Sequence, residues 1–481
     1  MAQRHLDRLT AVDASFLHQE GPVSHMHIGA LVRAEGPPPP YEEFLDSIRA
    51  RLHYVPRYRQ RLVYPPAGTG RPLWADDNDF NLEYHVRHTA LPAPGSDEQL
   101  TNLAARVFSQ QLDRSKPLWE LWLVEGLAGG DFALLSKSHH AMIDGIAGVD
   151  LGTVLFDLSP DGRPPEEGLE PWSPDPEPGP LDLLAAGVAG MAKASLGVAA
   201  KAVASLTRPE RALEQAAVAA EGLGEIAWAA ANPAPPSPLN VEIGPHRRFA
   251  GIACELSDFK AVKDVFGGTV NDVVLTVVAG ALRHWLHSRG VRTQGLELRA
   301  LVPVSVRHRD SDRNGAAGNR LAVMRGPLPV YVADPVERLG VVRGAMDDLK
   351  ESKQAVGAEV LTSMQQFAPP TILAQASRLN FSTRLFNLIV TNVPGPQFPL
   401  YVMGREMTSV FPIAFLPENH ALAIAIMSYN GQMNFGLLGD YDAMPDLNAF
   451  GEAIESSLAE LVSRAARERR RRSKARSKAK A

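Results

Sequence analysis

The sequence predicts an α/β (α+β) protein of two lobes, each with a mixed sheet flanked by helices. Three observations lead to this prediction. The chain has 481 residues, 45% apolar and 21% charged, which is globular in composition and long enough for two domains. Its apolar residues recur with both the two-residue period of strands and the 3.6-residue period of helices. Two proline-rich segments separate the regions where these periods occur.

The two proline-rich segments cover residues 160–180 and 232–245, and they enclose an alanine-rich block. Proline fixes its own backbone and biases the preceding residue toward extended structure, so both segments are predicted to be connectors. The expected organisation is an N-terminal lobe (1–159), a Pro-rich and Ala-rich helical connector (160–245), a C-terminal lobe (246–463) and a disordered basic tail (464–481).

In the first lobe, the periods predict elements in a clear order. They are a strand at 25–32, helices at 41–54 and 97–112, strands at 118–127 and 132–137 joined by a Gly129-Gly130 turn, and a helix at 145–156.

The second lobe mixes the same two periods. Its expected elements are a long helix at 270–289, a strand at 296–306, a helix at 334–352, a meander of strands at 408–415, 422–429 and 432–438, and a last helix from about Pro445. The Asn430-Gly431 pair is the hairpin signal within the meander.

Charge and cysteine content limit the class of protein. The single cysteine, Cys254, excludes an internal disulfide framework and a cysteine-cluster metal site, and favours a reducing compartment. The net charge of −5 combines a tail of +9 with a remainder of −14. Because we find neither a signal peptide nor an apolar run long enough for a membrane span, we expect a cytoplasmic protein, soluble or associated with a surface.

The sharpest local signal is the segment 136–148, SKSHHAMIDGIAG. An apolar strand leads into His139 and His140, and a short turn and a helix of small residues follow. Neighbouring residues on a strand point to opposite faces, so only one of the two histidines can face a given cavity. The pattern indicates one working histidine with a structural neighbour, and it does not suit a metal pair, which needs other spacing and further ligands.

A neutral imidazole can accept a proton near neutral pH. When a hydroxyl attacks a carbonyl it must lose its proton, and a positioned base for that step contributes about 10²–10⁴-fold in rate. No G-x-S-x-G nucleophile elbow occurs in the sequence. Direct attack by an acceptor hydroxyl, without an acyl-enzyme, is therefore the simpler interpretation.

Asp144 has structural and catalytic interpretations. It caps the helix predicted at 145–156, or it holds the histidine loop through a buried ion pair with an arginine, or it takes part in catalysis directly. Arg307, which follows an apolar strand, is our hypothesis for the arginine partner.

The His-His-x-x-x-Asp-Gly pattern resembles the CoA-dependent acyltransferase superfamily, which includes chloramphenicol acetyltransferase-like enzymes and peptide-synthetase condensation domains. Further segments resemble, in family order, the bacterial wax ester synthase/diacylglycerol acyltransferase family. These segments are VDASFL (12–17), HMHIG (25–29), PLW (117–119), VNDV (270–273), VPVSVR (302–307), GNR (318–320) and NVPGP (392–396).

The resemblance implies roles for the motif residues. His140 is the proton acceptor, His139 and Asp144 support the loop, and Gly145 permits a close backbone approach. It also implies two chloramphenicol acetyltransferase-like lobes with a tunnel between them, which acyl-CoA enters from one side and the alcohol from the other. Neither a metal nor a redox cofactor is needed, because CoA leaves as a thiol.

Other residues carry open alternatives. Asn271 opens a helix whose cap is Thr269 or Asn271 itself, and it either caps or lies near the tunnel and donates to substrate or to the oxyanion. The PLW segment is core packing or tunnel lining. His25 and His27 share one strand face, but a metal site there lacks apparent further ligands.

The connector and the tail also carry alternatives. Residues 181–206 place Leu181, Leu184, Val188, Met191 and Val198 at helical spacing, which indicates a connector helix packed across the lobes or a lipid contact. The tail is expected to be disordered. It is either solvated without a partner, or attracted to anionic lipid, or bound without specificity to nucleic acid.

The expected function is transfer of a long-chain acyl group from acyl-CoA to diacylglycerol, or to a fatty alcohol to give a wax ester. The enzyme is expected to lie at the inner membrane surface or on lipid droplets. Two alternatives stay open: an acyltransferase that uses a carrier-protein thioester, and a lipid-surface binding protein without turnover.

Overall fold

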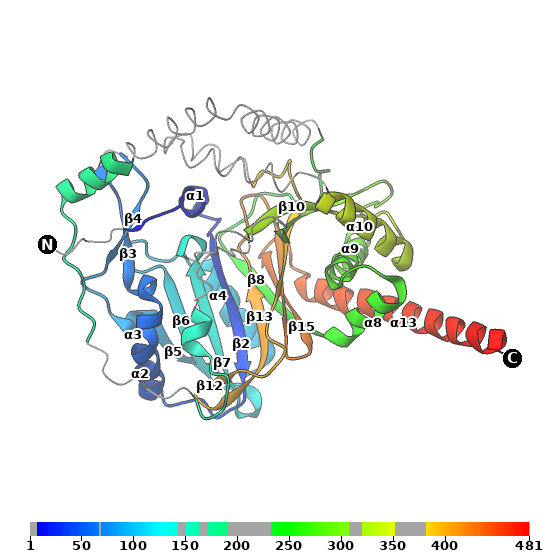
Figure 1. Cartoon of the computed structure of the whole chain (residues 1–481), viewed down its shortest axis with the longest axis horizontal. Helices are drawn as coiled ribbons and strands as arrows, with labels where there is room; N and C mark the ends of the chain where they lie inside the picture. Colours follow the sequence, from blue (N-terminus) through cyan, green and yellow to red (C-terminus); the bar gives the residue numbers. More distant parts are fainter. Residues whose placement is uncertain are drawn as a thin grey trace.

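The computed structural model describes residues 7–66, 69–142, 151–162, 171–190, 232–306, 320–351 and 381–480. Two six-stranded sheets lie side by side, each with helices packed on it, and a long C-terminal helix projects from one end (Figure 1). The prediction of two α/β lobes with mixed sheets is confirmed.

The N-terminal sheet has the strand order β12-β13-β2-β7-β6-β5, and β7 is antiparallel to both of its neighbours. Its strands are β2 (His27–Ala34), β5 (Val86–Ala90), β6 (Trp119–Glu125), β7 (Phe132–His139), β12 (Tyr401–Val402) and β13 (Arg405–Ile413). Its helical elements are α1 (Ala11–Gln19), α2 (Tyr41–Arg51), α3 (Leu82–His85), α4 (Asp97–Ser109) and α5 (Leu151–Leu155), with 3₁₀ turns at Leu52–Tyr54, Pro56–Arg59, Ala128–Gly130 and His140–Met142.

A small three-stranded sheet extends this lobe. It consists of β1 (Asp7–Arg8), β4 (Leu73–Asp76) and β3 (Gln60–Val63), in the order β1-β4-β3.

The C-terminal sheet has the order β10-β9-β11-β14-β15-β8 and contains parallel and antiparallel pairs. Its strands are β8 (Arg247–Glu255), β9 (Leu298–Val306), β10 (Arg320–Leu328), β11 (Leu388–Pro394), β14 (Leu422–Tyr429) and β15 (Gln432–Asp440). Its helices are α8 (Leu256–Phe266), α9 (Val270–Ser288), α10 (Pro335–Glu351) and α13 (Leu447–Lys480).

Local sequence explains where the longer helices begin. A capping box precedes α4, in which Ser96 accepts from the N–H of Gln99 while the Gln99 side chain accepts from the N–H of Ser96. Thr269 and Asp272 form the same arrangement at the start of α9. The expected elements at 41–54, 97–112, 270–289 and 334–352 therefore match the observed helices to within a few residues.

The expected meander is wrong in one respect. β14 and β15 form the predicted hairpin, and Asn430 and Gly431 adopt positive φ angles of 44° and 85° at its turn. β13, however, leaves the C-terminal lobe and pairs antiparallel with β2 in the other sheet. Alternation along a strand predicts which face is buried, but it does not name the partner strand.

The exchanged strand changes the predicted lobe boundary, because residues 401–413 complete the N-terminal sheet although they follow most of the C-terminal lobe. Gly436 on β15 allows the close approach of β13: a Cβ at that position would lie 1.7 Å from the carbonyl oxygen of Pro412. The exchange therefore ties the two sheets together.

A shared apolar cluster fills the space between the lobes. It contains Leu103 and Phe108 from α4, Phe249 from β8, and Phe415 and Leu416 after β13. Helix α4 packs directly against β8, and the N–H of Arg247 donates to the hydroxyl of Ser109 at 2.9 Å. The lobes thus share one interior along this boundary.

The described part of the connector lies on the small sheet and does not bridge the lobes. Leu183 and Ala186 of helix Pro180–Gly190 pack against Val63, Leu73 and Ala75. The predicted apolar face points outward instead: Leu181, Leu184 and Val188 are 80%, 38% and 50% exposed. The rest of the expected helix at 181–206 lies outside the described residues.

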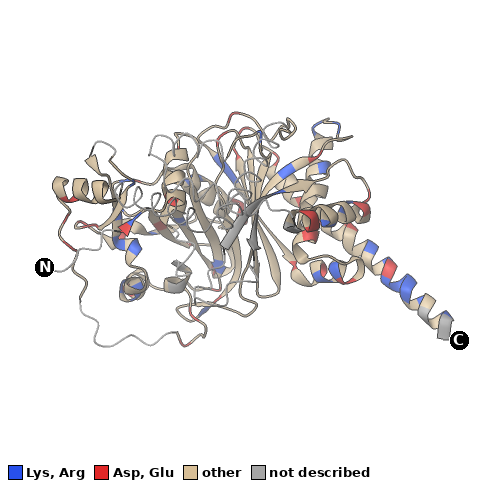
Figure 2. Ribbon diagram, turned by 45° about the horizontal axis from the view of Figure 1, so that its top comes forward, with Lys and Arg blue, Asp and Glu red and all other residues tan. Residues whose placement is uncertain are grey.

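The basic tail is helical and not disordered, since α13 continues through Lys480 and projects from the body as a positively charged rod (Figure 2). Arginine, lysine and alanine favour helices, and Glu468 pairs with Arg471 and Arg472 one turn away. The first half of α13 buries Phe450, Ile454 and other apolar side chains. The second half extends that packed helix into solvent.

Among the described helices, none is by itself long and apolar enough to cross a membrane. Within the part of the chain that the structure describes, only α8 and α9 counted together have the length and composition of a span, and they are bent by 103°. Both helices contribute to the buried core of the C-terminal lobe.

Candidate active site

The two adjacent histidines stand where β7 ends. His139 is fully buried, and its Nδ1 accepts a hydrogen bond of 3.0 Å from the N–H of Ala141. His140 begins the following 3₁₀ turn, is partly exposed, and donates its backbone N–H to the carbonyl of Met26 at 2.8 Å. One histidine therefore lies in the interior of the lobe while the other lies at its surface.

Aromatic rings from both halves of the chain surround His140. Phe16 on α1 stacks on the imidazole, with ring centroids 4.0 Å apart and planes inclined by 17°. Phe415 meets the ring edge-on at 5.8 Å. Phe381 contacts both phenylalanines, at 6.4 and 5.5 Å. Because Phe415 and Phe381 belong to the C-terminal half, His140 lies at the boundary between the lobes.

This apolar setting changes the acidity of the ring. Desolvation among the aromatic side chains, with a smaller electrostatic effect of His139, lowers the pKa of His140 to about 4. The imidazole is therefore neutral at physiological pH and has a lone pair with which to accept a proton.

A buried polar cluster supports the histidine pair. The carboxylate of Glu20, at the C-cap of α1, is 1% exposed and lies 3.6 Å from Nε2 of His139 and 3.6 Å from Nε2 of His27. Arg114 donates from Nε to the same carboxylate at 2.7 Å. His27 and His139 are register partners on β2 and β7.

Sequence reasoning missed Glu20 and Arg114. They lie 94 residues apart, and neither occurs in a recognisable spacing with the histidines. A weak signal existed for Glu20, which follows Phe16 by one helical turn at the end of α1. The contacts of the end of α1 with Arg114 and with the paired strands β2 and β7 bring these groups together.

Lys137 on β7 is a further buried charge near the site, two residues before His139. Its side chain is fully buried, and Nζ donates to the carbonyls of Val107 and Gln110 at 2.9 and 2.5 Å. These carbonyls lie at the C-terminal end of α4, where a cation interacts favourably with the helix. Burial lowers the pKa of Lys137 to about 8.

The other predicted histidines have local partners. Nε2 of His25 lies 3.1 Å from the carbonyl oxygen of Pro22, and His27 faces Glu20. Within the part of the chain that the structure describes, no group of three His, Cys, Asp or Glu side chains is arranged to hold a metal ion.

Asn271 lies in the first turn of α9, and Thr269, not Asn271, is the cap of that helix. The side-chain oxygen of Asn271 accepts a hydrogen bond of 3.2 Å from the amide of Asn392, at the end of β11. This contact orients the amide group of Asn271 and leaves its own N–H donors for another partner.

Three further predictions have different outcomes. Asp144, Gly145 and Arg307 lie outside the described residues, so their roles stay predictions. Leu118 and Trp119 of the PLW segment are fully buried, and the indole of Trp119 donates to the carbonyl of Tyr58 at 2.8 Å. The structure therefore favours core packing over tunnel lining for these two residues.

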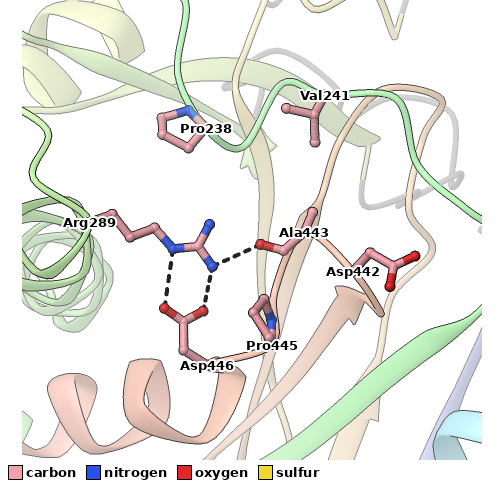
Figure 3. A pocket seen from close by; sticks show the side chains of 7 residues that line it. All are labelled: Pro238, Val241, Arg289, Asp442, Ala443, Pro445 and Asp446. Carbon is pink, nitrogen blue, oxygen red and sulfur yellow. Dashed lines mark hydrogen bonds and ion pairs between the residues drawn. The ribbon is translucent and has the colours of Figure 1, made fainter.

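A cavity of about 530 Å³ opens elsewhere, at the far end of α9 (Figure 3). Its lining includes Arg289, which caps α9 and makes an ion pair of 2.6 Å with Asp446. Asn271 is separated from Arg289 by the length of α9, about 27 Å at 1.5 Å per residue. This cavity is therefore distinct from the candidate site.

Comparison with known proteins agrees with the geometry. Residues 9–274 match the wax ester synthase/diacylglycerol acyltransferase catalytic domain, and residues 317–462 match the C-terminal domain of that group. A probable diacylglycerol O-acyltransferase of Mycobacterium tuberculosis is 34% identical over 461 residues, covering 95% of this chain and 96% of that protein. A putative diacylglycerol O-acyltransferase of Mycobacterium bovis is 34% identical over 474 residues, covering 95% and 99%.

Solved structures show the same likeness. A wax ester synthase/diacylglycerol acyltransferase from Marinobacter aquaeolei aligns with a TM-score of 0.66 and 28% identity, covering 95% of this chain and 100% of that one. The first condensation domain of the calcium-dependent antibiotic synthetase aligns with a TM-score of 0.54 and 15% identity, covering 95% and 97%. The second likeness concerns the fold alone.

Proposed function

The chain belongs to the wax ester synthase/diacylglycerol acyltransferase family and is an acyltransferase, and from that premise we propose that it moves a long-chain acyl group from acyl-CoA to the hydroxyl of diacylglycerol. Triacylglycerol is then the product. A fatty alcohol is the second acceptor, because the matched family and the Marinobacter relative are also named wax ester synthases.

One observation carries the proposal: a neutral imidazole stands between the lobes, with Phe16 stacked on it and Phe415 edge-on to it. In the proposed reaction, His140 takes the proton of the acceptor hydroxyl as its oxygen attacks the thioester carbonyl. The tetrahedral intermediate then expels CoA thiolate, which receives the proton from the imidazolium. A pKa near 4 keeps the ring unprotonated beforehand and makes it return the proton readily.

Asn271 is our candidate for stabilising the developing oxyanion. Its side-chain oxygen is held by Asn392, so its N–H groups have a fixed direction at the start of α9. Donors that are already oriented before the reaction stabilise an oxyanion most effectively. The scheme balances without a metal ion or redox cofactor, and this too is part of the proposal.

The test is an assay of the full chain with palmitoyl-CoA and either dioleoylglycerol or hexadecanol. Ester product and free CoA thiol are both followed. The lone protein thiol does not interfere, because Cys254 is buried and burial raises its pKa to about 12. We expect His140→Gln to lower the rate by about 10²–10⁴-fold in a folded protein.

His85 provides a matched control. Its ring also stacks on an aromatic side chain, Trp119 at 4.8 Å, and burial also lowers its pKa to about 4. We expect His85→Gln to keep the turnover per folded molecule. Full turnover by His140→Gln would refute the role of His140. Ester formation only from a carrier-protein thioester would favour an acyltransferase that uses carrier-bound acyl groups. Vesicle binding without turnover would favour a lipid-surface binding protein.

We also propose that residues 464–480 attract the protein to anionic lipid surfaces. Beyond Ala465, which is buried, this half of α13 is largely exposed and basic, and each basic residue near such a surface contributes about 1 kcal/mol. Cosedimentation with phosphatidylglycerol vesicles should depend on salt and be lost when the chain ends at residue 463. Equal binding of both proteins, or equal binding to pure phosphatidylcholine, would contradict the proposal.

A further inference from the structure

Helix α1 contacts both histidines through side chains that are one turn apart. Phe16 stacks on His140, and Glu20 faces His139. The two side chains share one side of the helix because they are four residues apart. The backbone N–H of Glu20 also donates to the carbonyl of Phe16 at 3.1 Å. The end of α1 is therefore a single rigid unit beside the histidine pair.

The hydrogen bond from Ala141 fixes the tautomer of His139. A backbone N–H is a donor only, so Nδ1 of His139 must accept from it and carries no proton. A ring that carries one proton then has it on Nε2, the atom that lies 3.6 Å from the Glu20 carboxylate. A negative charge at this place favours the tautomer with its N–H directed toward it.

Glu20 is a permanent negative charge. Burial on its own raises the pKa of this carboxyl group, but attraction from His139 across 3.6 Å and from the hydrogen-bonded guanidinium of Arg114 outweighs burial and holds the pKa at about 2. Arg114 is itself fixed, since it donates to the carbonyl of Leu17 at 2.9 Å. The carboxylate therefore stays charged at every pH well above 2, and Arg114 holds it in place.

We propose that Glu20 is a positioning residue for acyl transfer, which acts on His140 through His139. The carboxylate holds His139 as the Nε2–H tautomer, Nδ1 then accepts from Ala141, and this bond fixes the turn that presents His140. The inference rests on the proposed role of His140. It adds the buried Glu20, 120 residues before His140 in the chain, to the residues that orient the catalytic base.

The test is Glu20→Gln in the full chain, assayed with palmitoyl-CoA and dioleoylglycerol. The amide keeps the size of the side chain but removes its charge, and its NH₂ group can donate toward His139 and reverse the tautomer. We expect kcat to fall about 10–100-fold while KM for both substrates stays within about 2-fold, as for lost orientation of a catalytic histidine. A folded Glu20→Gln with wild-type kcat overturns the proposal.

Glu125 supplies the matched control. Its carboxylate lies 3.4 Å from Nε2 of His88, but both side chains are about 40% exposed and lie away from α1. Glu125→Gln therefore removes the same kind of Glu–His contact and is expected to leave kcat unchanged.

A double-mutant cycle separates positioning from packing. If Glu20 acts through His139, Glu20→Gln has no further effect on kcat in a His139→Ala background. Independent, multiplicative losses would overturn the inference. Should Glu20→Gln fail to fold, Glu20→Asp takes its place: it keeps the charge but withdraws it by one methylene, and an unchanged kcat in that folded variant is equally contrary to the proposal.

The two proposals fail differently. Activity of His140→Gln would refute the base, whatever Glu20 does. An inactive His140→Gln together with a fully active Glu20→Gln would refute only the role of Glu20.

Discussion

The inner strands β7 and β14 occupy the same place in their sheets, but they differ in the polarity of the side chains that they bury. Each is the fourth strand in the orders β12-β13-β2-β7-β6-β5 and β10-β9-β11-β14-β15-β8. β14 begins with six apolar residues, LAIAIM, whereas β7 ends in Ser-Lys-Ser-His. Lys137 and His139 are fully buried there. β14 therefore serves packing, whereas β7 encloses polar and charged side chains beside the candidate site.

This difference shows where the protein tolerates an unfavourable interior. Buried charges are costly to desolvate, and hydrophobic replacements are often as stable or more stable. In the N-terminal lobe, Glu20 and Arg114 neutralise each other beside the histidines, and Lys137 binds backbone carbonyls. The C-terminal lobe contributes to the site from its edge instead, through Asn271 and Asn392.

The largest effect should come from the apolar strand and should concern stability alone. Ile426 on β14 is fully buried, so Ile426→Ala should lower the free energy of unfolding by about 2–5 kcal/mol. The rate per folded molecule should stay at the wild-type level. Chemical denaturation combined with active-site-normalised assays would measure both. A specific loss of kcat in the folded variant would break the comparison.

Asn271→Ala should have the opposite signature. Loss of an oriented oxyanion donor lowers kcat by about 10²-fold, whereas the half-buried Asn271 is not the cap of α9 and should contribute little to stability. Steady-state kinetics and thermal unfolding of the same sample check this. As a control, Asn392→Ala removes the partner of Asn271 and should give a smaller loss of kcat. Wild-type kcat in both variants would exclude Asn271 and Asn392 from the site and leave only residues of the N-terminal lobe in it.

The pH at which kcat/KM falls on the acidic side should show how apolar the surroundings of His140 are. With its pKa lowered to about 4, the ring stays neutral at pH 5, and kcat/KM should fall only as the pH falls through about 4. If the base were a histidine with the ordinary pKa of about 6.5, kcat/KM would already have fallen about 30-fold at pH 5. Measurements of kcat/KM from pH 4 to 8 decide between them, with unfolding followed in parallel.

Stability should decline over the same range. The unfolded chain binds protons at its histidines below about pH 6.5, whereas His85 and His140 in the folded protein do so only near pH 4. The stability that His85 and His140 contribute is therefore complete above pH 6.5 and is lost as the pH falls toward 4.

The smallest effect concerns Lys137. Its pKa of about 8 lies below the unfolded value of 10.5, so the unfolded chain holds the proton over the interval between them. Stability should therefore rise from pH 8 to 10.5, by about 1–3 kcal/mol at most. Lys137→Met should lack this rise. Denaturant unfolding at pH 7.5 and 10 of both proteins measures it, and identical pH dependence would contradict the assignment.

Much of the architecture could be predicted from the sequence, because helices and strands leave periodic patterns. The helix at α9 and the hairpin of β14 and β15 are examples, fixed by a capping box and by Asn430-Gly431. The partner of β13 could not be predicted, since alternation does not name a partner. The tail was expected to be disordered because it lacks apolar residues, but its arginines and alanines extend an existing helix.

Some residues of the candidate site could likewise be predicted from the sequence, and others could not. His139, His140 and Asn271 lie in contiguous motifs, so the sequence identifies them. Glu20 and Arg114 are brought to His139 only by the pairing of β2 with β7 and by the end of α1. Lys137 lies inside the histidine segment, but its burial became evident only from its contacts with the end of α4.

The exchanged strand β13 has a consequence for biosynthesis. Until residue 413 has emerged from the ribosome, β2 has an unpaired edge, although the histidine segment was translated some 270 residues earlier. The N-terminal lobe cannot mature as the first half of the chain is made. The sheet that carries the candidate site is completed only near the end of translation, so a nascent chain that stalls before this point carries the motif but lacks the strand that pairs with β2.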